Sequence, residues 1–103
     1  MNQNNFLVKL DEDGFPPPEL VVRTQRFFID LHSHLYEVKG YVIEGQINFN
    51  MRGIKHTYIS GDIFHLLPNQ FHSESIGNMG LKYLVSRKLP NVDEPVIVRE
   101  FDT

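Results

Sequence analysis

Residues 32–45 read HSHLYEVKGYVIEG, and residues 61–72 read GDIFHLLPNQFH. In the first stretch His32 and His34 stand two residues apart, and residues two apart on a β-strand project from the same face. Two imidazoles on one face provide part of a metal site, so a third ligand must come from a distant strand. His72 is the candidate, because it follows a tight turn and opens the next segment.

The same spacing has plainer interpretations. His32 and His34 also fit a polar outer face, or a pair of core histidines whose ring nitrogens bond to carbonyl groups. His56, beside Lys55 and near a turn, is expected in solvent. His65 lies in an apolar strand and could face either the interior or the opposite side.

The segments around these stretches are rich in β-branched and aromatic residues, which favours strands. The sequence predicts strands at residues 20–23, 26–31, 38–43, 46–51, 54–59, 63–67, 81–85 and 95–101. Turn residues separate them at Glu44-Gly45, Arg52-Gly53, Ser60-Gly61-Asp62, Pro68-Asn69, Gly77-Asn78 and Asn91. Many short strands with regularly spaced turns are typical of a sandwich or barrel. Residues 46–51 alternate strictly, so one face of that strand is expected in the core.

One short helix is predicted before the strands. Asn4 or Asn5 can cap its first turn, and Gly14 can end it in the left-handed conformation. The three prolines at 16–18 then form a rigid, extended connector.

Length and composition restrict the class of protein. The 103 residues predict one domain, with the helix and connector at 1–18 and the β-barrel at 20–101. Because the chain has no cysteine, any metal must be held by nitrogen and oxygen. The net charge of -3 and the scattered basic residues argue against a nucleic-acid partner. No apolar run approaches the ~20 residues that span a bilayer, and the N-terminus is unlike a signal peptide, so a cytoplasmic protein is expected.

The two opening stretches resemble the two motifs of the cupin superfamily. The first cupin motif has His-x-His, an acidic residue shortly afterwards, and a strand that ends in glycine; here these are His32, His34, Glu37 and Gly45. The second has Gly-Asp, an apolar strand, a turn and a histidine, as from Gly61 to His72. Two motifs in order and at the family's spacing are far more specific than either alone.

The resemblance covers residues 29–73, and a closer one is to small stand-alone cupins. Those begin with a helix that ends in Asp-Gly-Phe and finish with a Gly-x-x-Tyr-Leu-Val-x-Arg strand. Residues 13–15 and 80–87 are the counterparts here. The resemblance implies an all-β protein: a double-stranded β-helix (jelly-roll) barrel with a short N-terminal helix.

The second motif departs from the family in its turn, which usually reads Pro-x-Gly. Asn69 stands at the glycine position. Asparagine adopts the left-handed conformation more readily than other non-glycine residues, so the turn is expected to persist.

The resemblance also implies a divalent transition metal inside the barrel, held by His32, His34 and His72. Glu37 is a candidate fourth ligand, but it follows His34 by three residues where the family's acid follows by four or five. Strict alternation directs Glu37 to the opposite face, so only a bulge or bent turn brings it inward. Such ligands suit Fe, Mn, Co, Ni, Cu or Zn, and binding should weaken below about pH 6.5.

The open coordination positions are expected to face an apolar interior that accommodates a small organic ligand. The aromatic candidates for its lining are Tyr36, Tyr41, Phe49, Phe64, Phe71 and Tyr83. The resemblance implies a metal-dependent enzyme, such as an oxygenase or isomerase. The alternative is a non-catalytic module that binds or senses a small molecule, and a third hypothesis is a barrel that uses no metal.

A homodimer is expected, because small cupins pair through their outer sheets and an exposed sheet edge invites pairing. The N-terminal segment and the strand within residues 93–102 are the predicted contact elements.

Overall fold

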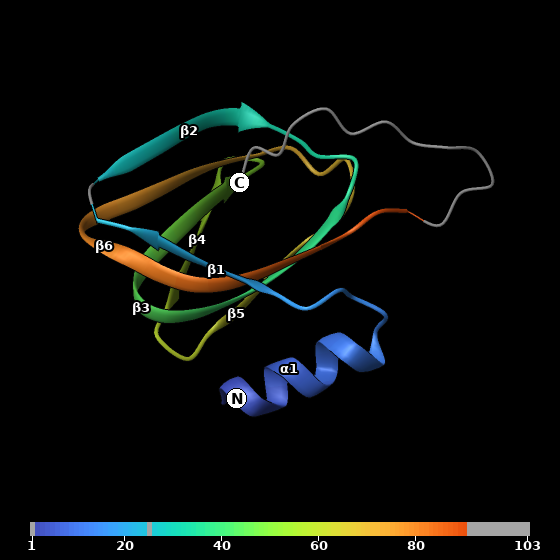
Figure 1. The fold of residues 1–103 in the computed structure, drawn as a ribbon. Coiled ribbons are helices and arrows are strands. Elements are labelled where there is room, and N and C mark those ends of the chain that lie inside the picture. Colours follow the sequence, from blue (N-terminus) through green and yellow to red (C-terminus); the bar gives the residue numbers. More distant parts are fainter. Residues whose placement is uncertain (1, 25, 91–103) are drawn as a thin grey trace.

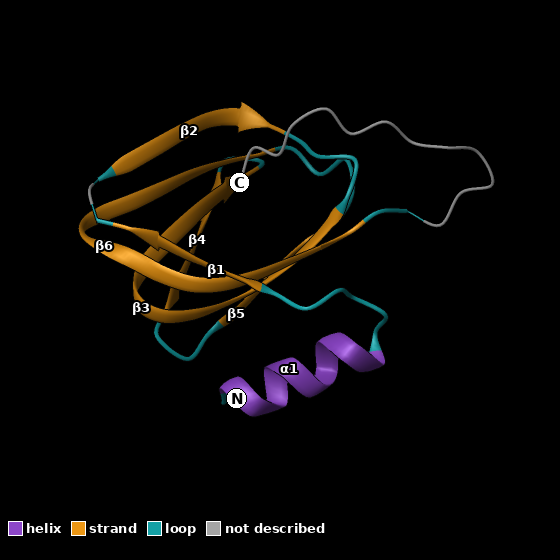
Figure 2. Cartoon of the chain, viewed as in Figure 1, coloured by secondary structure: helices purple, strands orange, loops and turns teal. Residues whose placement is uncertain are grey.

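The computed structural model describes residues 2–24 and 26–90, which form one helix and six strands (Figures 1 and 2). The elements are α1 (Gln3–Glu12), β1 (Glu19–Arg23), β2 (Phe27–His32), β3 (Glu37–Met51), β4 (Ile54–Ile59), β5 (Ile63–Leu66) and β6 (His72–Lys88). The strand predicted at 95–101 lies outside the described residues. No helix in the described part of the chain has the length and apolar character needed to cross a membrane.

β3 and β6 pair antiparallel along most of their lengths and belong to both layers of the fold (Figure 1). The first half of β3 and the second half of β6, paired at Gly40 and Val85, lie between β5 and β1. The second half of β3 and the first half of β6, paired at Asn48 and Ser75, lie between β4 and β2. One continuous sheet thus bends into two layers.

The bend falls at Gly45 in β3 and Gly80 in β6. Both glycines have positive φ, 87° and 76°, a conformation that side chains rarely adopt. A Cβ on Gly45 would lie 2.2 Å from the carbonyl oxygen of Gly80, so the backbones meet with no room for a side chain. Register shifts on both sides of Gly45 mark bulges, which let a strand bend while its pairing continues.

The turns predicted at Glu44-Gly45 and Gly77-Asn78 do not separate strands in the structure. β3 runs unbroken through the first pair, and β6 runs unbroken through the second. Glycine and asparagine are typical of turns when only neighbouring residues are considered. Here they lie where two long strands bend, and the two strands are paired on both sides of the bend.

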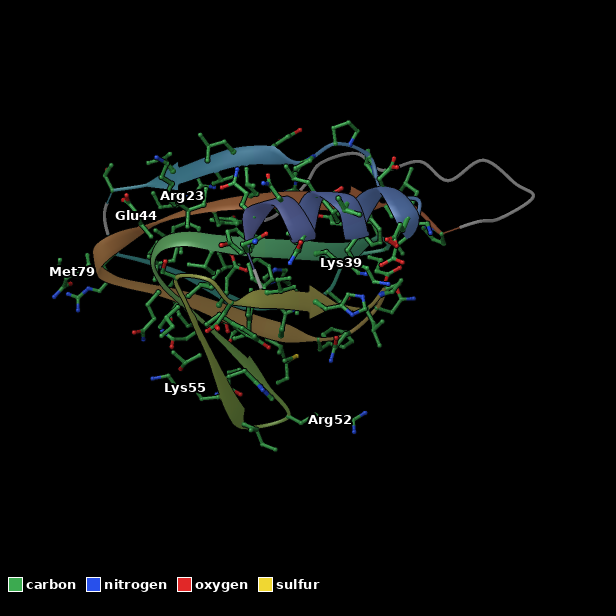
Figure 3. All side chains as sticks on the ribbon, turned by 90° about the horizontal axis from the view of Figure 1, so that it is seen from below. Arg23, Lys39, Glu44, Arg52, Lys55 and Met79 are labelled. Carbon is green, nitrogen blue, oxygen red and sulfur yellow. The ribbon has the colours of Figure 1, made fainter. Side chains whose placement is uncertain are left out.

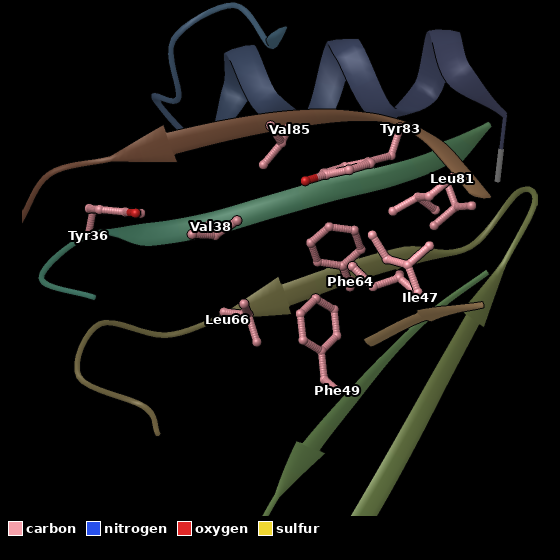
Figure 4. Close-up of a cluster of buried hydrophobic side chains, with 11 residues drawn as sticks. Tyr36, Val38, Ile47, Phe49, Phe64, Leu66, Leu81, Tyr83 and Val85 are labelled. Atoms are coloured by element: carbon pink, nitrogen blue, oxygen red, sulfur yellow. The ribbon is translucent and has the colours of Figure 1, made fainter. Parts of the chain in front are cut away.

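The core lies between the two layers (Figure 4). The alternation predicted for residues 46–51 is confirmed, because Ile47 and Phe49 are buried while Asn48 and Asn50 are not. The cluster contains Tyr36, Val38, Val42, Ile47, Phe49, Phe64, Leu66, Ile76, Leu81, Tyr83 and Val85. Four of the six predicted interior aromatic residues are among them, which are Tyr36, Phe49, Phe64 and Tyr83.

α1 covers the outer face of the layer that contains the first half of β3 (Figure 3). Phe6 and Leu10 are buried there, and the Phe6 ring stacks on Tyr41 with 5.5 Å between ring centroids. Tyr41 therefore faces the helix and not the interior, which corrects the prediction for that residue. Lys39 lies on the strand that α1 covers. Its Nζ forms an ion pair with Oδ2 of Asp13, at the C-terminal end of α1, over a distance of 2.5 Å.

The ends of α1 confirm one capping prediction and correct the other. Gly14 has φ of 78° and ends the helix as predicted. The N-cap is Asn2, whose Oδ1 accepts from the backbone N–H of Asn5 at 2.9 Å. Because the helix begins at Gln3, Asn4 and Asn5 lie within its first turn and neither is the cap.

The bend generates a stability prediction. Gly45→Ala should lower the free energy of unfolding by at least about 3 kcal/mol, because the new Cβ meets backbone at a positive φ. Gly53→Ala is the matched control: its φ is 79°, but nothing lies within 4 Å of the added Cβ. The control should lose only about 1–2 kcal/mol. Equal losses for the two variants in urea unfolding would show that the bend tolerates a side chain.

Candidate metal centre

Three histidines meet at one end of the barrel. β2 ends at His32 and β6 begins at His72, and these two residues are partners in the β2–β6 register. His34 lies in the loop that follows β2. One ring nitrogen from each of the three lies within 4.8 Å of the others. The structure therefore brings together the three histidines that the sequence singled out.

Two of these rings are oriented by backbone carbonyls. Nδ1 of His32 lies 2.7 Å from the carbonyl oxygen of Asp30, and Nδ1 of His72 lies 2.9 Å from that of Gln70. A carbonyl oxygen only accepts, so in the neutral rings Nδ1 carries the proton and donates it. The lone pair is then on Nε2 of both rings, which is the arrangement typical of metal-ligating histidines.

The nitrogens that carry these lone pairs are buried. Nε2 of each of the three histidines is buried, and those of His32 and His72 have no hydrogen-bond partner among the described residues. A buried polar nitrogen without a partner is costly and calls for an explanation such as a bound ion or water. A metal ion ligated by the three nitrogens satisfies them together, so this donor set fits the implied metal.

Burial also favours the ligand form of His72. The ring is 1% exposed, and this burial lowers its pKa below the ordinary value of 6.5. The hydrogen bond to the Gln70 carbonyl favours the charged ring and so raises the pKa in part. Nearby His32 lowers the pKa further. His72 is therefore neutral at pH 7, the protonation state in which an imidazole binds a metal.

Glu37 lies outside the histidine group. It is the first residue of β3, and its carboxylate Oε2 lies 2.5 Å from Nε2 of His65 on β5. The next residue, Val38, is buried in the core, so alternation directs Glu37 outward. His65 shares that outer face, with 42% of its side chain exposed, which resolves the choice that the sequence left open.

A buried carboxylate that the sequence analysis missed lies beside the histidines. Glu74 is 3% exposed and lines a cavity with His34 and Arg87. The sequence contains a signal for this position. Glu74 follows His72 by two residues on β6, so alternation places both side chains on the inner face. The sequence analysis predicted no strand between residues 67 and 81, so it did not apply this alternation to Glu74.

That cavity is very small. Its volume is about 10 Å³, which is room for about one water molecule. Aromatic residues of the core surround this cavity, and the small organic ligand predicted for the interior stays a prediction. The last predicted lining residue, Phe71, is not inside at all, because it is 61% exposed.

Comparison with solved structures identifies the fold. A cupin-2 domain containing protein from Shewanella frigidimarina matches with a TM-score of 0.59 and 15% identity, over 85% of this chain and 93% of that one. A predicted oxalate decarboxylase from Thermotoga maritima matches with a TM-score of 0.61 and 19% identity, over 80% and 73%. A cupin superfamily protein from Desulfitobacterium hafniense matches with a TM-score of 0.61 and 10% identity, over 69% of this chain and 64% of that one.

The sequence itself matches no family model and no curated protein. The solved structures nevertheless agree on one architecture, the jelly-roll barrel of the cupins. The predicted fold class is confirmed: this chain has the jelly-roll barrel fold of the cupins, and a group of three histidines that could hold a metal lies at the end of its barrel.

Metal content tests the site directly. Protein purified without a tag, or reconstituted without oxygen, should contain about one equivalent of a transition metal by plasma mass spectrometry. His72→Ala should lose it, because two imidazoles remain. His65→Ala is the matched control and should keep the metal, since His65 is outside the group. Metal retained by His72→Ala, or absent from the wild type, would contradict the site.

The buried His72 also predicts a pH dependence of the metal-free protein. Its pKa is lowered by folding, so below the ordinary value the unfolded chain binds a proton that the folded chain does not. The free energy of unfolding should therefore fall as pH drops from about 7.5 to about 5.5. Urea midpoints should fall less in His72→Gln than in the wild type, and parallel curves for the two proteins would contradict this origin.

Proposed function

We propose that this chain binds one divalent transition metal through His32, His34 and His72, and that a small organic molecule binds at the remaining coordination positions. The observation that carries the proposal is a pair of buried Nε2 atoms, on His32 and His72, that have no hydrogen-bond partner among residues 2–24 and 26–90. Carbonyl hydrogen bonds at Nδ1 orient both rings. Three protein ligands leave coordination positions for water or a substrate, as in catalytic metal sites.

The proposed activity is that of a metal-dependent enzyme, such as an oxygenase or isomerase. A metal in this site supplies Lewis acidity and, if it is redox-active, electron transfer. The histidines hold and orient it, while the carboxyl of Glu74, which lines the cavity beside His34, can accept or donate a proton. The predicted oxalate decarboxylase among the similar structures makes small carboxylates a reasonable first set of substrates.

The alternative is a non-catalytic module that binds or senses a small molecule. The filled interior favours it, because a cavity of about 10 Å³ does not enclose a substrate and keep water away from it. Binding at the mouth of the barrel needs no such enclosure.

Turnover in a Glu74→Gln variant separates the two functions. Wild-type protein loaded with Fe, Mn, Co, Ni, Cu or Zn is screened with oxalate and other small carboxylates for product release and oxygen consumption. An enzyme should lose at least about 100-fold in turnover in Glu74→Gln while it keeps its metal. If no metal form turns over any carboxylate, yet carboxylates change the visible spectrum of the Co(II) form, the binding module is supported instead.

We also propose a homodimer. β1 lies at the end of the strand order in the described sheet, and its Leu20 and Val22 are 56% and 53% exposed. An edge strand with exposed apolar side chains favours pairing with another chain. Analytical ultracentrifugation at micromolar concentration should give the sedimentation coefficient of a dimer. A monomer at that concentration would contradict the proposed homodimer.

A further inference from the structure

The outer face of the layer formed by β4, β3, β6 and β2 carries a hollow with a volume of about 230 Å³. The strand registers place its residues side by side, because Asn48 of β3 is opposite Ser75 of β6, and Ser75 is opposite Phe28 of β2. The outward-facing residues that line this polar hollow are Phe28, Asn48, Asn50, Lys55, Ser73 and Ser75. None of them belongs to the candidate metal centre.

The side chains that line the polar hollow point away from the barrel core. Ile47, Phe49 and Glu74 alternate with them along β3 and β6 and are buried, and neighbouring residues of a strand project from opposite faces. The helix α1 packs on the other layer, where Tyr41 contacts it, and Figure 3 shows Lys55 well apart from α1. Within residues 2–24 and 26–90, the helix therefore leaves the polar hollow uncovered.

The lining of the polar hollow is almost uncharged. Lys55 is the one charged side chain among its outward-facing residues, although exposed surfaces are rich in lysine, glutamate and aspartate. The other polar groups are amides and hydroxyls, which both donate and accept hydrogen bonds. The hydroxyl groups of a ligand do the same, and the Lys55 ammonium can donate to their oxygens. The lining therefore matches a neutral ligand that is rich in hydroxyl groups.

Hydrogen bonds fix one part of this lining and leave another part available. Oδ1 of Asn48 accepts from Oγ1 of Thr57 at 2.8 Å and from Nε2 of Gln46 at 3.1 Å. These bonds determine the orientation of the Asn48 amide. The side chains of Asn50 and Ser73 have no hydrogen-bond partner in the described part of the chain. They can bond to a ligand without breaking a bond within the protein, which lowers the cost of binding.

An aromatic ring completes the polar hollow. Phe28 is 66% exposed and lies across β6 from the amides of β3. A single exposed apolar residue is normal on a protein surface, but this ring lines the same hollow as the amides and hydroxyls. A sugar ring presents C–H groups on its faces, which pack on an aromatic ring, and hydroxyl groups around its edge. Both halves of such a ligand find a matching group here.

From this juxtaposition of Phe28 with amides and hydroxyls we propose that the polar hollow binds a neutral saccharide. The sugar ring packs on Phe28, and its hydroxyl groups bond to the side chains of Asn48, Asn50 and Ser73. The site is on the outer face of the sheet, so this proposal does not rest on the metal-dependent function.

The test follows backbone amide NMR signals of ¹⁵N-labelled protein during titration with glucose, maltotetraose and cellotetraose. At least one of these neutral saccharides should give saturable shifts, largest at residues 28, 48, 50, 73 and 75. Phe28→Thr, which keeps a residue that favours strands, should weaken that binding at least about fivefold. Asn50→Ala should weaken it about three- to tenfold, because the ligand loses a hydrogen bond.

Phe71→Thr provides the matched control. Phe71 is 61% exposed, which is close to the value for Phe28, but it does not line the polar hollow. This variant should bind the saccharide as the wild type does. Because the three substituted side chains are exposed, the variants should fold, and an unchanged melting temperature checks this.

Four outcomes overturn the proposal. The first is that none of the three saccharides shifts the signals, and the second is that one binds equally well to wild type, Phe28→Thr and Asn50→Ala. The third is that the acidic chain tetragalacturonate binds while the neutral chains do not, since the ligand would then be an anion held by Lys55. The fourth is that Phe28→Thr converts a dimer into a monomer while saccharide affinity is unchanged, since this face would then be a subunit interface.

Discussion

The pairing of β3 with β6 is the contact on which the other elements depend. It runs from Glu37 opposite Lys88 to Asn50 opposite Ser73, and both layers take their central strands from it. Because one ladder passes through both layers, the bend at Gly45 and Gly80 sets how the layers face each other. The remaining strands pair with the outer edges of β3 and β6, so the positions of these two strands determine where the others lie.

This pairing also positions the candidate metal centre. β6 begins at His72, and β2 pairs with the first half of β6. His32, the last residue of β2, therefore lies opposite His72. The loop from His34 to the start of β3 then closes that end of the barrel. The three candidate ligands thus come from two segments far apart in sequence, residues 32–34 and the start of β6, and the β2–β6 pairing places His32 opposite His72. Backbone pairing of this kind favours the fixed ligand geometry that a metal site needs.

The electrostatic character of the site follows from the same placement. The carbonyl oxygens two residues before His32 and His72 accept hydrogen bonds from Nδ1–H of these rings, so the lone pairs lie on the buried Nε2 atoms. Apolar and aromatic side chains fill the space around them, which raises the cost of leaving these nitrogens without a partner. The filled core and the candidate metal centre are therefore coupled: the packing that stabilises the barrel also buries His72 and lowers the pKa of its ring.

Much of this could be predicted from local sequence. Alternation in residues 46–51 reports the buried face directly, and the left-handed Gly14 and Asn69 follow from residue type alone. The two motifs also indicated the three histidines, although His34 lies in the loop after β2, so the strand spacing that suggested the His32–His34 pair does not apply to it. What the tertiary structure decided depends on partners distant in sequence. The glycines of the long strands bend a ladder instead of ending it, and Glu37 contacts His65 outside the site. Glu74 is buried because β6 continues past it, and the interior is filled because side chains from both layers meet there, a packing that no single segment of sequence encodes.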